Sequence, residues 1–458
     1  MTGRSAPRRL DPVIALAVLL PLLALLSVAL LQPTAPEQTV TGPSSAALNR
    51  LSVACPTPVQ RPAGDLQLTR GAGGGDGPVQ LRVNRDDRLE SRDRVRVDDG
   101  VTEAPDSGGA AVATGRGDAA PGLVAGRDEA GAVPECRSPW YDDWFVGAGA
   151  TARQATVIEL VNPDASAAVV NIDVHGPTGP IEDASWSGVT VPGNGVRWVR
   201  LAERPARRAI AAHVQVDQGR VRAFARHTFD RLGQGTATTD YLHAQQQPAE
   251  ENLLLGVPTR GAQRSLFLAN PGDDEVRATV RIVTEQSTLV PSGTERITVP
   301  PRAHVQFPLA DLLDADAAEG ALGLLVESTA PVVAGARGLV DRDLVAVGPA
   351  TAYDEPMTAV VPTGQKTLIA GGASRTGVVR VTATAADGRT IWDGKRFEIA
   401  ADQALRVELP DPAVRVQVVG RRTPVAATVL VDDRRGRGTV RLAPAPVEAE
   451  VPDVRPAR

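Results

Sequence analysis

The sequence repeats itself with a period of about one hundred residues. The segment Glu159-Leu-Val-Asn-Pro163 recurs as Phe267-Leu-Ala-Asn-Pro271, and the two asparagines are 108 residues apart. The turns Val191-Pro-Gly and Val299-Pro-Pro keep the same spacing of 108 residues. A repeat of this length indicates copies of one structural unit, each of which must form similar strands and turns. The repeated Asn-Pro predicts a strand end and a turn, because Asn tolerates turn geometry and Pro has no N–H to donate to a ladder.

Two further copies extend the pattern. Val257-Pro-Thr259 returns as Val361-Pro-Thr363, which places a third copy near the C-terminus. The stretch 50–136 resembles a fourth, degenerate copy, since Ala120-Pro-Gly-Leu-Val-Ala-Gly-Arg127 is similar to Ala330-Pro-Val-Val-Ala-Gly-Ala-Arg337. Its low apolar content leaves open whether this stretch is a true repeat.

Each copy alternates apolar and polar residues over short segments. In the second copy the expected strands are 264–269, 276–284, 295–299, 304–309, 323–327 and 332–340. Such alternation is typical of strands with one buried and one solvated face. Roughly one hundred residues with about seven short strands match an immunoglobulin-like β-sandwich in size. The alternative is a β-propeller, in which each copy would supply two four-stranded blades.

An uncharged run, 13–31, precedes the repeats. As a helix it would be about 28 Å long, close to the ~30 Å hydrocarbon thickness of a bilayer. Three arginines in residues 4–9 precede the run, so the positive-inside rule predicts a cytoplasmic N-terminus and an extracytoplasmic C-terminal bulk. The pattern favours an uncleaved, single-pass anchor in the cell membrane. A signal peptide cleaved at Ser27-Val28-Ala29 is the alternative.

These features predict the organisation of the chain. The expected parts are a cytoplasmic N-terminus (1–12), a transmembrane helix (13–31), a linker (32–49), a disulfide-closed degenerate β domain (50–136), three β-sandwich repeats (137–246, 252–352 and 356–443) and a disordered tail (444–458).

Cys55 and Cys136 are the two cysteines of the chain. Two cysteines in an exported chain most simply form one disulfide. The loop that they would close contains about eighty residues, for which loop-closure entropy gives roughly 4 kcal/mol of stabilisation. Neither cysteine has a CxxC partner or a histidine at ligand spacing, which argues against metal binding or redox chemistry.

No catalytic signature is found in the sequence. There is no GxSxG, HExxH, Walker loop or paired CxxC, so the sequence predicts neither an enzyme, nor a cofactor, nor a metal site. The net charge of -5 and the pI near 5.7 argue against a nucleic-acid partner. His213 and His227 are interpreted as ordinary, partly exposed strand residues, and Arg226 and Arg337 as outward-facing strand arginines.

One aromatic cluster stands out. Trp140, Tyr141, Trp144 and Phe145 fall within six residues of a chain with only 3% aromatic residues. Such side chains could form a platform on which sugar rings stack, because aromatic faces supply a large contact area. The alternative is that they plug the joint between the disulfide-closed region and the first clear sandwich.

The Arg-flanked anchor, Cys55-Pro56, the Cys-x-x-Pro-Trp-Tyr motif of residues 136–141 and the repeated Leu-x-Asn-Pro strands resemble an uncharacterised family. Its members are membrane-anchored, extracytoplasmic proteins of high-GC Gram-positive bacteria. The resemblance implies a compartment and an architecture, but neither an activity nor any catalytic residue.

Together, these observations predict a non-enzymatic, membrane-anchored scaffold or binding protein of the cell envelope, with envelope proteins or glycans as partners. The first alternative is a glycan-binding module that uses Trp140 and Trp144. The second is a cell-wall hydrolase with two converging carboxylates.

Overall fold

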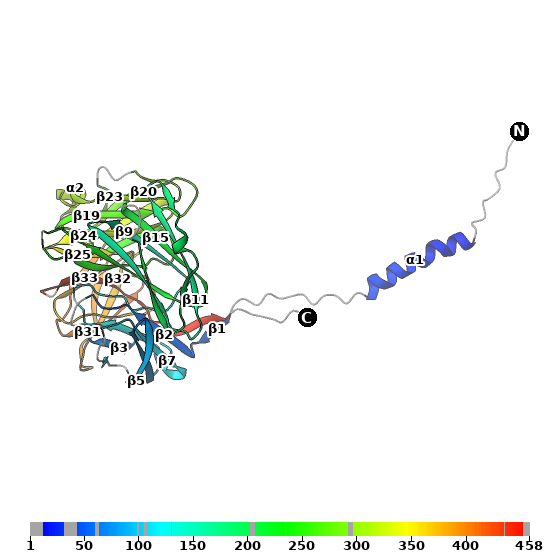
Figure 1. The fold of residues 1–458 in the computed structure, drawn as a ribbon, viewed down its shortest axis with the longest axis horizontal. Helices are drawn as coiled ribbons and strands as arrows, with labels where there is room; N and C mark the ends of the chain where they lie inside the picture. The colour runs from blue at the N-terminus through cyan, green and yellow to red at the C-terminus, as the bar shows by residue number, and fades with distance from the viewer. Residues whose placement is uncertain are drawn as a thin grey trace. The chain divides into compact units, whose positions relative to one another are not determined.

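The computed structural model describes residues 12–31, 44–59, 64–98, 100–104, 108–129, 131–201, 207–233, 235–291, 296–434 and 436–451. Most of the expected N-terminus and linker, and residues 452–458 of the expected C-terminal tail, therefore lie outside the described residues. The chain divides into two units, one of Met1–Ala46 with Glu450–Arg458 and one of Ala47–Ala449. The first unit contains the helix α1, and the second contains nearly all of the strands (Figure 1).

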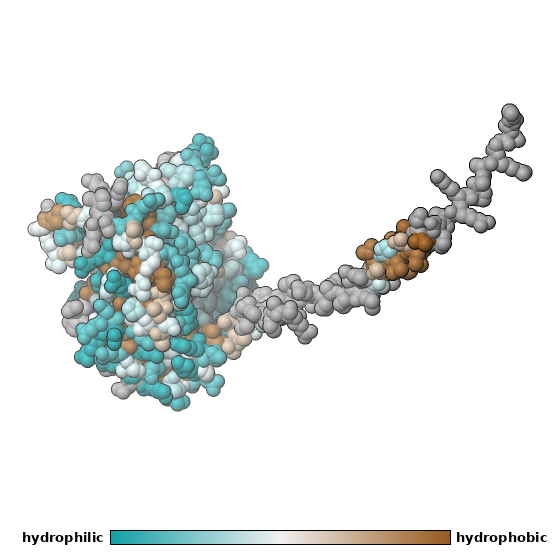
Figure 2. Space-filling view, turned by 45° about the vertical axis from the view of Figure 1, so that its right-hand side comes forward, coloured by the Kyte–Doolittle hydropathy of each residue, from teal (hydrophilic) through white to brown (hydrophobic). Residues whose placement is uncertain are grey.

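Helix α1 (Pro12–Leu31) is apolar in sequence apart from Ser27 and includes Pro21. Its described side chains form a hydrophobic surface (Figure 2), on which Leu16 and Leu25 are 63% and 68% exposed. Within the described part of the chain, no helix combines the length and the apolar content that crossing a bilayer requires. The transmembrane role of 13–31 therefore stays a prediction.

The second unit confirms the expected all-β class. The strands of its first half fall into two groups, which we name the N-terminal sandwich and the first repeat. The N-terminal sandwich comprises β2 (Arg50–Cys55), β3 (Leu66–Arg70), β4 (Gly77–Arg85), β5 (Arg88–Val97), β6 (Thr102–Ala104), β7 (Ala111–Arg116), the turn η1 (Gly117–Ala119) and β8 (Leu123–Arg127). The first repeat comprises β9 (Asp142–Thr151), β10 (Gln154–Asn162), β11 (Ala168–Gly176), β12 (Gly179–Ile181), η2 (Ala184–Trp186), β13 (Val189–Val191), β14 (Gly195–Arg200), β15 (Arg207–Gln218), β16 (Arg222–Phe229) and β17 (Thr238–Leu242).

Two further groups, the second and third repeats, follow. The second repeat comprises β18 (Ala249–Leu255), β19 (Ala262–Ala269), β20 (Val276–Val283), β21 (Thr288–Leu289), β22 (Ile297–Val299), β23 (His304–Pro308), α2 (Ala310–Leu313), η3 (Asp316–Ala318), β24 (Gly323–Val340) and β25 (Asp343–Val347). The third repeat comprises β26 (Met357–Val360), β27 (Lys366–Gly371), β28 (Gly377–Ala385), β29 (Thr390–Ile399), β30 (Leu405–Glu408), β31 (Ala413–Arg421), β32 (Ala426–Asp433), β33 (Gly436–Arg441) and β34 (Ala443–Pro444).

All four groups pair their strands in one order. In the third repeat, one sheet runs β29-β28-β31-β26 and the other β30-β27-β32-β33. The N-terminal sandwich repeats this order as β5-β4-β7-β2 and β6-β3-β8, and the other repeats follow it with equivalent strands. In each group, one hydrophobic cluster draws side chains from both sheets. The groups are therefore β-sandwich-like, as expected, and each sheet faces a partner sheet across a shared core.

The strand order differs from that of an immunoglobulin constant domain. Counted along each copy, the third strand pairs with the sixth and the second with the fifth, as in that domain. The first strand, however, pairs with the sixth, the seventh with the second and the fourth with the third, so three strands lie in the other sheet than in that domain.

Strand β24 replaces two of the strands that the sequence predicts. Its first part pairs with β18 and β20, and its second part pairs with β19 and β25. The change occurs around Pro331, which has no N–H to donate to a ladder. One continuous strand thus passes from one sheet of the second repeat to the other, whereas the first repeat uses β15 and β16 for these positions.

The repeated Asn-Pro motif closes a turn, as the sequence predicts. The Asn162 side chain donates to the carbonyl oxygen of Ser166 at 2.8 Å and accepts the backbone N–H of Asp164 at 2.9 Å. Asn270 makes the equivalent bonds to Asp274 and Gly272, at 2.7 and 2.9 Å. Such asparagine contacts replace backbone pairing where a strand ends.

The segment expected as a disordered tail, 444–458, is partly ordered. Strand β34 pairs with β26, and β35 (Glu448–Val451) pairs with β1 (Ser44–Ala47). Only residues 452–458 of that segment lie outside the described residues. The pairing with strands far away in sequence explains why local composition did not reveal it.

Candidate functional site

The sandwiches meet at a common junction in the second unit. Strand β17 packs against β25, and β25 packs against β33, so the last sandwich strands of the three repeats lie side by side. Among its described residues, the N-terminal sandwich has no equivalent strand. Residues 131–137 take part in the junction instead, since Val133 belongs to the hydrophobic cluster of the third repeat. The N-terminal sandwich and the second repeat lie towards opposite ends of this unit (Figure 1).

A carboxylate of this segment holds the junction together. Glu135 lies 2.6 Å from Arg441, 3.3 Å from Arg137 and 3.1 Å from the Nδ1 atom of His243. Burial opposes the charge, but Arg441, Arg137 and His243 together hold the pKa of Glu135 well below its usual value. Glu135 is therefore a carboxylate at neutral pH, and it joins residues from three sandwiches.

A second ion pair lies close to the first. Arg222, at the start of β16, is 3.3 Å from Asp143 on β9, and both residues are buried. The Nε and Nη1 atoms of Arg222 form no hydrogen bond with the described residues. Burial raises the pKa of Asp143 and lowers that of Arg222, against the attraction of each for the other. Buried donors that make no hydrogen bond are costly, so this guanidinium keeps unused donor capacity beside the ion pair.

The three arginines of these ion pairs, Arg137, Arg222 and Arg441, line a cavity of about 700 Å³, which we name the junction cavity. Its walls come from the three repeats and from the segment after Cys136, and they include Arg137, Trp140, Arg222, Gln245, Tyr353 and Arg441. A smaller cavity of about 320 Å³ shares Arg137, Trp140, Tyr353 and Arg441, and its other walls come mainly from the N-terminal sandwich, the third repeat and the segment around Cys136. Ligand pockets in proteins typically measure about 300–1,000 Å³.

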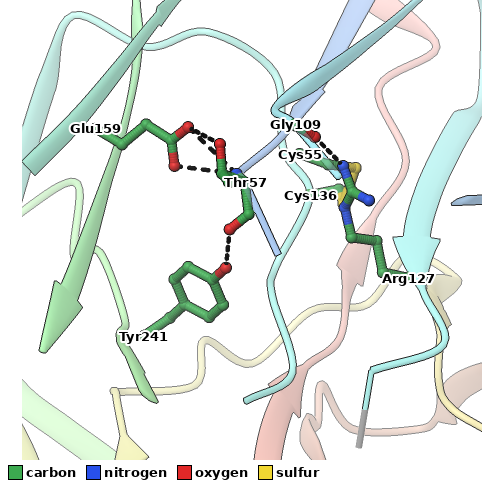
Figure 3. Close-up of a disulfide and its surroundings, with 7 residues drawn as sticks. All are labelled: Cys55, Thr57, Gly109, Arg127, Cys136, Glu159 and Tyr241. Carbon is green, nitrogen blue, oxygen red and sulfur yellow. Dashed lines mark hydrogen bonds between the residues drawn. A yellow bond between two sulfur atoms is a disulfide. The ribbon is translucent and has the colours of Figure 1, made fainter. Parts of the chain in front are cut away.

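The disulfide predicted from the sequence is present between Cys55 and Cys136. Figure 3 shows that it lies beside Arg127, which donates to the carbonyl oxygen of Gly109 at 2.6 Å. Its two cysteines are close in sequence to residues of the junction, because Thr57 follows Cys55 by two positions and Glu135 precedes Cys136. The disulfide thus holds in place the two segments that carry Thr57 and Glu135, both of which contact the repeats.

Thr57 links the N-terminal sandwich to the first repeat (Figure 3). Its hydroxyl and its backbone N–H donate to the carboxylate of Glu159, at 2.7 and 3.0 Å, and its carbonyl oxygen accepts the hydroxyl of Tyr241 at 2.5 Å. Burial raises the pKa of Glu159 to about 7, although the bonds from Thr57 favour the charged form. Burial also raises the pKa of Tyr241 well above its usual value.

The four aromatic residues predicted as a ligand platform or a plug separate in the structure. Trp140 lines both cavities and stacks on Tyr141, whose exposed fraction is 60%. Trp144 and Phe145 are buried, and Trp144 stacks on His213 with ring centroids 3.9 Å apart. An accessible surface for a ligand is thus limited to Trp140 and Tyr141.

The chain belongs to a family of unknown function, DUF5719. The family matches residues 92–410, which is more than half of the chain. The expected membership of an uncharacterised family is therefore confirmed. The match begins inside β5 and ends before β31, so it includes most of the walls of the junction cavity. No curated protein matches the chain. Membrane anchoring and an origin in high-GC Gram-positive bacteria stay predictions.

Two interpretations of the sequence are wrong in their detail. His227, expected to be partly exposed, is fully buried between Thr156 and Arg337. Arg337, expected to face outward, is buried and lies over the ring of Phe267 at 4.7 Å, with Gly147 as a further acceptor. Both residues lie at the contact between the first and second repeats, a surface that one sandwich considered alone would leave to solvent.

The junction residues were not singled out from the sequence. Glu135 and Arg441 are 306 positions apart, and Arg222 resembles any other arginine at the start of a strand. The adjacency of Glu135 to Cys136 was one usable signal, because a disulfide fixes its neighbours. No group of three or more His, Cys, Asp or Glu residues suited to hold a metal ion occurs among the described residues.

Proposed function

We propose that this protein is a non-enzymatic binding or scaffold protein of the cell envelope, anchored in the membrane and extracytoplasmic. The junction cavity supports this proposal most directly. Its walls carry guanidinium groups, amides and aromatic rings from several sandwiches, the mixture with which proteins orient a ligand.

The compartment is proposed on two grounds. The run 13–31 has no charge and follows several arginines, which favours an anchor with its N-terminus in the cytoplasm. A disulfide persists in an oxidising compartment, and Cys55 and Cys136 form one. We further propose that the four sandwiches are tandem copies of one unit, of immunoglobulin-like size but with three strands in the other sheet than in an immunoglobulin constant domain.

Glycan recognition is the form of binding that one observation favours. Trp140 is only partly buried and lines both cavities. Trp144 is buried, so the aromatic side chains offered to a glycan are those of Trp140 and Tyr353, which line both cavities.

The test is retention of the purified full chain, in detergent, on isolated cell-wall polysaccharide and peptidoglycan. We expect the unaltered protein to be retained and Trp140→Ala to be retained at least about tenfold less, the loss expected for an aromatic contact of about 1.4 kcal/mol. Equal retention of both proteins would contradict the proposal. So would cleavage of the envelope material that a single carboxylate substitution abolishes, since that would indicate a hydrolase.

A further inference from the structure

We infer that the junction cavity binds an anionic saccharide, whose acidic group pairs with Arg222 and Arg137 and whose ring stacks on Trp140. This inference deepens the proposed function and rests on it, because it names the ligand class of the same cavity. The acidic group can be a sugar carboxylate or a sugar phosphate, which present the same oxygen acceptors to a guanidinium.

The inner wall of the cavity carries an excess of positive charge. Three guanidinium groups line it, those of Arg137, Arg222 and Arg441, and they face two carboxylates, Glu135 and Asp143. Counted as ions, these five groups leave one positive charge in excess. Two further lining residues, Glu251 and Asp402, are solvent-exposed, so water screens their charges more strongly than those of the inner wall.

The wall arginines differ in how many N–H donors they have left for a ligand. Arg441 has little capacity to spare, because four of its five N–H groups already donate, to Glu135 and to the carbonyl oxygens of Pro349 and Ala244. Arg222 differs, since its buried Nε and Nη1 atoms form no hydrogen bond with the described residues, although Nη1 lies 3.3 Å from the carboxylate of Asp143. An anion that brings two oxygens would satisfy this guanidinium in the bidentate geometry it prefers.

The indole of Trp140 is held close in the fold to the guanidinium of Arg222. The backbone N–H of Trp140 donates to the carbonyl oxygen of Val221 at 3.0 Å, and Val221 directly precedes Arg222. One β-bridge therefore places the indole and the guanidinium on neighbouring parts of the same wall. A ring against the indole and an acidic substituent on the guanidinium is the combination that an acidic sugar supplies.

Amide side chains form another part of the cavity wall. Amide side chains of Gln246, Gln247 and Gln403 line the cavity and are at least partly exposed. Amides both donate and accept hydrogen bonds, which matches the hydroxyl groups of a sugar. The volume of about 700 Å³ is large enough for a ligand of more than one sugar ring.

The experiment is calorimetric titration of the purified full chain in detergent with three probes. These are a disaccharide that contains glucuronic acid, glucose 6-phosphate and the neutral disaccharide cellobiose. We expect at least one anionic probe to bind about tenfold or more tightly than cellobiose, with an affinity that falls as salt rises. Preference for glucuronate or for the phosphate identifies the source of the negative charge.

The key variant is Arg222→Gln, which should weaken binding of the preferred anionic probe at least about tenfold. Arg226→Gln is its matched control. It lies on the same strand, its guanidinium sits over Trp198 at 5.0 Å, and it does not line the cavity. We expect this control to bind as the unaltered protein does. If Arg222→Gln unfolds, the double variant Arg222→Gln/Asp143→Asn removes both charges of the ion pair and should show the same loss.

Three outcomes would overturn the inference. Cellobiose could bind as tightly as the anionic probes, Arg226→Gln could lose as much affinity as Arg222→Gln, or no probe could bind the folded protein at about 5 mM, a concentration that detects even weak sites. Retention on envelope material that depends on Trp140 would leave the proposed function standing in each case. Loss of that retention as well would end both proposals.

Discussion

At the scale of single residues, burial at the joints between sandwiches moves several ionisable groups away from their usual behaviour. Glu159 and His304 do so in opposite directions, because burial favours the neutral form of each and the neutral carboxyl is protonated while the neutral imidazole is not. The two residues therefore predict opposite effects of pH on stability.

Glu159 should make the protein less stable as the pH rises. Its pKa is raised from 4.5 to about 7 by burial, so the folded state binds the proton more tightly than the unfolded state. This stabilisation is fully present below about pH 4.5 and is lost as the pH rises to about 7, an effect of roughly 3 kcal/mol. We expect Glu159→Gln to remove this decline, as measured by urea unfolding between pH 5 and pH 8. An unchanged decline in the variant would contradict the account.

His304 should act in the acid range. Burial lowers its pKa from 6.5 to about 3, so the stabilisation from keeping it neutral is present above about pH 6.5 and is lost as the pH falls. At pH 5 the expected loss is about 2 kcal/mol. The variant His304→Gln should lose less stability than the unaltered protein between pH 7 and pH 5, when both are followed by urea unfolding. Identical losses would show that His304 titrates normally.

At the scale of elements, the sequence predicted well what depends on local pattern. The period-two alternation of 276–284 corresponds to β20, and the Asn-Pro motifs close turns at Asn162 and Asn270. Contacts between copies could not be predicted from the sequence pattern. The bond between Glu135 and Arg441 joins the N-terminal sandwich to the third repeat, and no local pattern encodes which sandwich faces which.

The disulfide should stabilise more than its own sandwich. Cys55 and Cys136 are 81 positions apart, for which loop-closure entropy gives about 4 kcal/mol. The segments beside them carry Thr57 and Glu135, which contact other sandwiches. We therefore expect Cys55→Ala/Cys136→Ala to lower the free energy of unfolding by at least about 2–5 kcal/mol. The double variant should also bind any ligand of the junction cavity more weakly. A reductant should reproduce both effects in the unaltered protein but not in the variant. A loss of stability below about 1 kcal/mol would contradict the expectation.

At the scale of the whole molecule, the sandwiches are not independent domains joined by flexible linkers. Residues 47–449 form one compact unit, and Arg441 alone donates to Glu135 and to backbone oxygens at the ends of the first and second repeats. Because the junction is shared, we expect this unit to unfold cooperatively.

Arg441→Ala tests that sharing. It leaves the carboxylate of Glu135 without its nearest cation in a buried site, which typically costs about 3–5 kcal/mol. The unfolding transition should fall in midpoint or split, as repeats separate before they unfold. Arg406→Ala is the control, since its ion pair with Glu408 is solvent-exposed and should contribute no more than about 1 kcal/mol. Equal effects of the two substitutions would mean that the junction is not a shared centre of stability.

The most direct test of the account is the location of its folded body. Leu232 is 51% exposed, so Leu232→Cys offers a thiol to a maleimide reagent that does not cross membranes. Ala225→Cys is the control, because that position is buried and should stay unlabelled. We predict that Leu232→Cys is labelled in intact cells as fully as in lysed cells. Labelling that appears only after lysis would place the sandwiches in the cytoplasm and contradict the account.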